Sequence, residues 1–149
     1  MKRVLIVCNN LDAGGIQKAL VNMLKCLDDK YDITLMLFSK TGILLGDVPE
    51  KVKVISPNPC YKMLGLNKRA LMKYPVLYGE KVVLKLIAKC FGRSAAMRLV
   101  GIFQKKIKGY DVAISFPHLT NYHCFENGCG DFVLNKIEAD KKICFFLIF

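Results

Sequence analysis

The sequence predicts an α/β protein in which helices flank a parallel sheet. Three apolar runs of strand length, at residues 4–8, 33–38 and 112–116, are separated by stretches whose apolar residues recur every three or four positions. The runs are almost wholly apolar, which is typical of strands that helices cover on both faces. A length of 149 residues, 53% of them hydrophobic and 23% charged, suits one ordered domain spanning 1–149.

The N-terminal unit is predicted to be a strand, a glycine-containing loop, a helix and a second strand. The strand at 4–8 leads into a polar loop that contains Gly14 and Gly15. Residues 15–27 carry an apolar stripe at helical spacing, and the second strand follows at 33–38. The unit therefore places its glycines where its helix begins.

Beyond the second strand the pattern becomes irregular. We predict a loop at 41–50 that contains one helical turn. A short strand at 52–55 follows, and Pro57 and Pro59 end it because proline cannot continue a strand ladder.

The middle of the chain, residues 67–108, has a helical pattern that is interrupted near Pro75 and at Gly92. The last of these helices is predicted at 93–108. It would end at Gly109 with cations in its last turn, as the helix dipole favours.

The C-terminal part begins with the strand predicted at 112–116. Residues 120–139 are polar and broken by glycine, which indicates a short helix and a loop. The last apolar run is 143–149.

The positive charge is concentrated in one region. Net charge at pH 7 is +11, and between residues 62 and 108 twelve Lys or Arg stand against one acid, Glu80. Such a block attracts polyanions or anionic lipid, although an ordinary solvated helix face has the same composition. Few aromatic residues lie among the cations, so nucleic acid is not an expected partner.

One predicted helix, residues 80–91, offers a more specific basic face. Helical spacing places Lys81, Lys85 and Lys89 on one side, which makes them candidates for docking on an anionic membrane. The alternative is a surface helix that packs its apolar side on the sheet. That apolar side would consist of Val82, Val83, Leu86, Ile87 and Cys90.

The glycine loop is the clearest candidate for a binding site. Backbone N–H groups at a helix N-terminus can bind a phosphate or an acidic sugar group. The dinucleotide-binding pattern Gly-x-Gly-x-x-Gly is absent, and Gln17 stands where a Walker lysine would be needed. The alternative is that Gly14 and Gly15 only form a tight turn.

Cysteine and histidine usage does not predict a metal site. Seven cysteines, an odd number, indicate reduced thiols in a cytosolic protein. The spacing of His118, His123, Cys124 and Cys129 matches no common zinc arrangement, so no metal is expected. His118 follows a predicted strand and is either a hydrogen-bonding or basic group at the ligand edge or an ordinary loop histidine.

Taken together, these segments resemble the N-terminal domain of family 4 glycosyltransferases, which are retaining enzymes of the GT-B fold. The resemblance spans nearly the whole chain. It rests on residues 4–7, 14–20, 31–35, 110–116 and 141–144.

The resemblance implies a Rossmann-like domain that forms the acceptor-side half of a hexosyltransferase. Gly14, Gly15 and Ile16 would face the diphosphate of a nucleotide-sugar, which is the donor substrate, and no cofactor or metal is implied. Asn10, His118 and Asn121 are the candidates to contact a glycan or lipid-linked acceptor. Catalytic residues remain unknown.

The sequence also departs from the family. Gln17 stands where members commonly have Glu, and the chain ends at 145–149, where a donor-binding domain would follow. We therefore expect a domain that is inactive alone. It is a natural truncation, the product of a frameshifted or split gene, or a subunit completed by a separate C-terminal chain. The family implies a cytoplasmic location, peripheral on the inner face of the plasma membrane. The alternative is a non-catalytic Rossmann-like module that binds a partner subunit or an anionic membrane.

Overall fold

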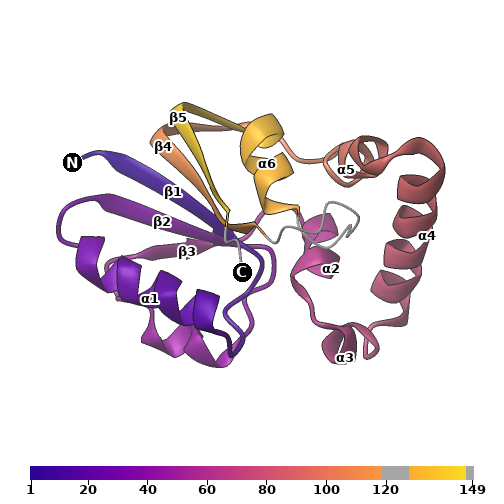
Figure 1. Ribbon diagram of the computed structural model, residues 1–149, viewed down its shortest axis with the longest axis horizontal. Helices are drawn as coiled ribbons and strands as arrows, with labels where there is room; N and C mark the ends of the chain where they lie inside the picture. Colours follow the sequence, from indigo (N-terminus) through magenta and orange to yellow (C-terminus); the bar gives the residue numbers. More distant parts are fainter. Residues whose placement is uncertain (119–127, 147–149) are drawn as a thin grey trace.

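The computed structural model describes residues 1–118 and 128–146, and in this part of the chain it contains one five-stranded parallel sheet. The strand order is β3-β2-β1-β4-β5 (Figure 1). This arrangement confirms the predicted α/β class and is consistent with a Rossmann-like fold. The strands are β1 (Arg3–Cys8), β2 (Asp32–Leu37), β3 (Lys53–Ile55), β4 (Ile107–His118) and β5 (Ile137–Phe146).

The central strands are buried on both faces, as their apolar runs predict. Along β1, Leu5 and Val7 belong to one core cluster, whereas Val4, Ile6 and Cys8 belong to the other. Successive side chains of a strand point to opposite faces, so one apolar run supplies both cores. Burial of this kind is the main favourable term in folding, at about 25 cal/mol per Å² of apolar surface.

Helix α1 (Gly15–Leu27) has the predicted bounds and covers one face of the sheet. Its buried residues Leu20, Val21 and Leu24 pack into the core cluster of that face. Helix α6 (Cys129–Lys136) covers the other face, where Phe132 and Val133 are buried (Figure 1).

The chain between β2 and β4 is mostly helical. Gly92, at φ 86°, separates two of these helices, and Pro75 opens the longer one, so both predicted interruptions are confirmed. The elements are η1 (Ile43–Asp47), η2 (Pro59–Tyr61), α2 (Lys62–Gly65), α3 (Lys68–Leu71), α4 (Pro75–Phe91) and α5 (Arg93–Val100). Helix α4 lies at the end of the molecule away from the sheet and packs mainly against α5, α2 and α3 (Figure 1).

Two predicted boundaries are wrong. The helix expected at 93–108 ends at Val100, where the Gly101 N–H bonds to the Met97 carbonyl, and β4 already begins at Ile107. Strand β5 begins at Ile137, inside the segment predicted as a loop. In both places the pairing of β4 with β5 overrides the local pattern.

Within residues 1–118 and 128–146, none of the helices has the length and apolar character needed to cross a membrane.

Candidate functional site at the carboxyl edge of the sheet

The strand order places a topological switch point between β1 and β4. The chain moves outward through β2 and β3 on one side of β1 and through β4 and β5 on the other. In open parallel sheets ligands bind in the crevice outside the carboxyl ends of such strands. The loop that carries Gly14 and Gly15 follows β1 at this edge, and His118 is the last residue of β4.

The loops that follow β1 and β2 are hydrogen-bonded to each other. The Ser39 N–H donates to the Asn9 carbonyl at 3.0 Å, and the Leu11 N–H donates to the Thr41 carbonyl at 2.9 Å. Gly42 has φ 122°, and a Cβ at this position would overlap the Leu11 backbone. These contacts hold the start of the glycine loop in one position.

Asn10 braces this loop. Its side-chain amide donates to the Gly65 carbonyl at 2.6 Å, and its Oδ1 accepts a bond from the Asp12 N–H at 3.3 Å. Both ends of the side chain are therefore engaged within the protein. Of the other acceptor-side candidates, His118 is described only as a backbone position in β4, and Asn121 lies outside the described residues.

The glycine pair is not required by the fold. Gly14 has φ −169°, which is extended backbone open to any residue, and Gly15 is not among the glycines of positive φ. A Cβ on Gly15 would meet nothing within 4 Å, whereas a Cβ on Gly14 would overlap Oε1 of Gln17, the far end of a flexible side chain that would have to move. A tight turn that needs glycine therefore does not explain the pair.

The start of α1 is suited to an anion. Gly14 caps the helix without a side-chain hydrogen bond, and the first turn carries no acidic residue. Helix N-termini with free N–H groups attract negative charge. Gly14 and Gly15 are exposed, whereas Ile16 is partly buried against the core beneath α1. The nearby Asp12 carboxylate accepts a bond from the Asn67 side chain at 3.2 Å.

Two buried thiols lie behind this edge. Cys129 Sγ donates to Asn9 Oδ1 at 3.0 Å, and desolvation raises its pKa well above the usual value. Burial likewise raises the pKa of Cys8 to about 12, so neither thiol is a thiolate near neutral pH. Among the described residues no group of His, Cys, Asp or Glu is placed to hold a metal ion; His123 and Cys124 lie outside them.

The predicted basic face of α4 needs a correction. Lys85 and Lys89 are exposed, but Lys81 is only 7% exposed and lies on the buried side of the helix with Leu84. The three lysines therefore do not share an exposed face. The helix instead exposes apolar side chains. The exposed fractions are 73% for Val76, 59% for Leu86 and 78% for Phe91.

No family model, no curated protein and no solved structure matches this chain.

Proposed function

We propose that this chain is the acceptor-side domain of a nucleotide-sugar-dependent glycosyltransferase. One observation carries the proposal: Gly14 and Gly15 expose a helix start without a side-chain cap at the switch point, although the backbone requires glycine at neither position and the packing leaves open space at Gly15. Missing side chains at such a position let a charged ligand approach backbone N–H groups.

The proposed chemistry is stabilisation of a leaving group. As the sugar leaves, negative charge grows on the nucleoside diphosphate, and fixed N–H donors at the start of α1 would offset it. The hydrogen bonds between Leu11 and Thr41 and between Ser39 and Asn9 hold the loop, so little reorganisation is needed. A donor-binding domain, on the same or a second chain, would hold the nucleotide.

Amide chemical shifts of ¹⁵N-labelled chain during titration with nucleotide-sugars and with inorganic pyrophosphate test this proposal. We expect shifts concentrated at Gly14, Gly15 and Ile16, and their loss in Gly15→Val. The matched control is Gly46→Val, because Gly46 also has open space around a Cβ. Shifts spread over the basic helices, or equal behaviour of both variants, would contradict the proposal.

The same proposal predicts the outcome of a transfer assay. With a panel of nucleotide-sugars, the 149-residue chain alone should transfer little or no sugar, because a single such domain cannot enclose the donor. Robust turnover by the chain alone would show that the assignment to the acceptor side is wrong.

The exposed apolar face of α4 favours a second candidate function, which is docking on an anionic membrane. Val76, Val83 and Leu86 are exposed on one side of the helix, and the exposed Lys85 and Lys89 flank them. A helix with an apolar face and cationic flanks binds at the headgroup boundary of acidic bilayers. The excess of positive charge between residues 62 and 108 also favours an anionic membrane as the binding partner.

Flotation with vesicles tests this second candidate. We expect co-flotation with vesicles containing anionic lipid, its loss in Leu86→Glu, and its weakening in the double variant Lys85→Glu and Lys89→Glu. Ile43→Glu is the control, because Ile43 is even more exposed than Leu86 but lies in η1, away from α4. No flotation at low salt, or equal loss in the control, would rule the membrane out.

A further inference from the structure

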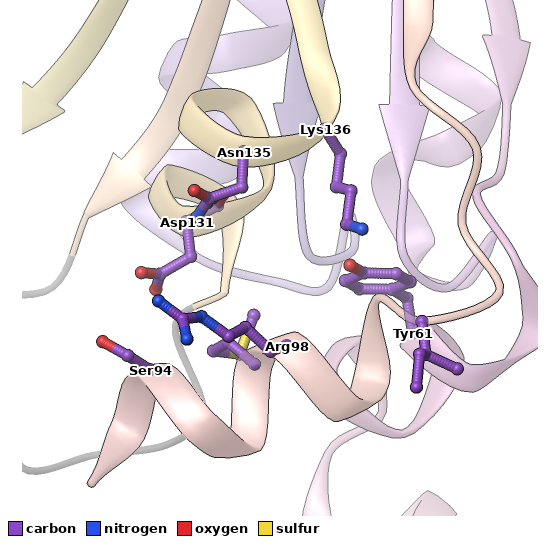
Figure 2. Close-up of a pocket in the computed structure, with 8 residues that line it drawn as sticks. Tyr61, Ser94, Arg98, Asp131, Asn135 and Lys136 are labelled. Carbon is purple, nitrogen blue, oxygen red and sulfur yellow. Dashed lines mark hydrogen bonds between the residues drawn. The ribbon is translucent and has the colours of Figure 1, made fainter.

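A cavity lies between α5, α6 and η2, away from the glycine loop. Its volume is about 380 Å³, within the usual range for small-molecule sites. Figure 2 shows side chains from three elements turned toward one another around it. The polar residues that line it are Tyr61, Ser94, Arg98, Asp131, Asn135 and Lys136.

The cavity carries a surplus of positive charge. Arg98 and Lys136 both line it, and in the part of the chain that the structure describes neither has an ion-pair partner. The one acid in the lining, Asp131, is neutralised by Arg93, whose Nη2 lies 2.7 Å from its Oδ2. In Figure 2 the Arg98 guanidinium is turned toward the Asp131 carboxylate and the Lys136 ammonium toward Tyr61. With Arg93 offsetting Asp131, the two cations leave the lining with a net positive charge.

Gly101 leaves space beside the side chains of Lys136 and Tyr61. A Cβ on Gly101 would lie 2.5 Å from Lys136 Cε and 2.9 Å from the Tyr61 hydroxyl. The backbone does not explain the glycine, because its φ is −84°, which any residue adopts. The absence of a side chain lets the ammonium stem and the hydroxyl reach the same place.

The Tyr61 hydroxyl is a fixed donor. The ring is 1% exposed and packs against Phe38 and Phe132, with centroids 5.2 and 4.9 Å away. Among the described residues the hydroxyl has no hydrogen-bond partner. Burial raises the pKa of Tyr61 to about 12, so the proton is present near neutral pH.

We propose that this cavity binds a small organic phosphate that carries hydroxyl groups. The Arg98 guanidinium and the Lys136 ammonium would bind the phosphate, with the Tyr61 hydroxyl donating to a third oxygen. Asn135 gives its amide hydrogen to the Asp131 carbonyl at 2.9 Å, so its Oδ1 is left to accept from a ligand hydroxyl. Ser94 offers a hydroxyl on the α5 side.

Calorimetric titration of the full chain tests the proposal with four probes: inorganic phosphate, glycerol phosphate, glycerol and acetate at constant ionic strength. We expect saturable binding of both phosphates, tighter for glycerol phosphate, and none for glycerol or acetate. Arg98→Gln and Lys136→Gln should each weaken binding by about tenfold, the usual effect of one charge-assisted hydrogen bond. Lys25→Gln, an exposed lysine on α1, is the charge-matched control.

Two further variants show whether a loss of binding comes from the local geometry at Gly101 and Tyr61 or from a general loss of structure. Gly101→Ala should weaken phosphate binding at least as much as Lys136→Gln does, and Tyr61→Phe should weaken it too, while both keep the native circular dichroism spectrum. No saturable binding of either phosphate would overturn the proposal. So would binding of acetate equal to that of phosphate, or an equal loss in Lys25→Gln. None of these outcomes depends on whether Gly14 and Gly15 face a sugar donor.

Discussion

Arg93 and Asp131 join the two helices that form the walls of the cavity. The Arg93 Nη2 of α5 donates to the Asp131 Oδ2 of α6 at 2.7 Å, and both side chains are more than two thirds buried. We predict that Asp131→Ala lowers the free energy of unfolding by about 1 to 3 kcal/mol, because it removes one partner of a partly buried cation. Urea denaturation measures the effect.

The control for this variant is the exposed pair of Lys51 and Asp29. Both of its side chains lie mostly in solvent, where ion pairs add little to stability. Asp29→Ala should leave the urea midpoint unchanged within error. An equal loss of stability in the two variants would show that the pair of Arg93 and Asp131 contributes no more than an exposed ion pair.

Alanine substitutions at Gly42 and Gly46, four residues apart, should have contrasting effects on stability. Gly42→Ala should destabilise the protein by at least about 2 kcal/mol, because its φ is 122° and its Cβ would overlap the Leu11 backbone. Gly46→Ala should be close to neutral, since its Cβ would meet nothing within 4 Å. Thermal unfolding of both variants checks the contrast, and similar melting temperatures would refute it.

Thiol labelling should sort the cysteines by burial. At pH 8 we expect an alkylating reagent to modify Cys26 and Cys90 rapidly, because both are exposed. Cys8 and Cys129 should react only after denaturation, since burial raises the pKa of each thiol and blocks access. Peptide mapping by mass spectrometry reads the order, and early labelling of Cys8 would contradict the described packing.

Stability should fall in alkaline solution. The pKa of Cys8 rises from 9.0 to about 12 on folding, so the native state holds this proton more tightly than the unfolded chain. Its contribution is therefore complete below pH 9 and is lost as pH rises from 9 toward 12. At pH 10 the loss is about 1 kcal/mol. Cys8→Ala should flatten this part of the stability profile, and an unchanged slope would rule out the role of Cys8.

The sequence predicted those helices and strands whose apolar pattern is continuous along the chain. The α1 stripe and the runs of β1 and β2 are dense enough in apolar residues to predict the type of each element, with its boundaries correct to within one residue. The start of β5 was missed because Glu138 and Asp140 interrupt the apolar pattern. Those positions need no apolar side chain, since in the described sheet β5 has a neighbour on one side only.

Of the two candidate sites, the glycine loop could be predicted from the sequence and the cavity could not. The glycine loop is contiguous in sequence, so its position after a strand and before a helix was predictable. The cavity combines Tyr61, Arg98 and Lys136, which lie far apart along the chain and share no motif. They come together only where η2, α5 and α6 meet around the cavity. Helical spacing also failed to show which side of α4 faces inward, and Lys81 was misplaced for that reason.

The position of β1 in the sheet has a consequence for synthesis on the ribosome. The Arg3 N–H bonds to the Asp111 carboxylate at 2.6 Å, across 108 positions of chain, and β1 pairs with β4 over the same span. The half-sheet β3-β2-β1 can form early, but one edge of β1 stays unpaired until β4 has emerged. During that interval the nascent chain exposes an apolar strand edge, so slowed translation between β3 and β4 should favour aggregation.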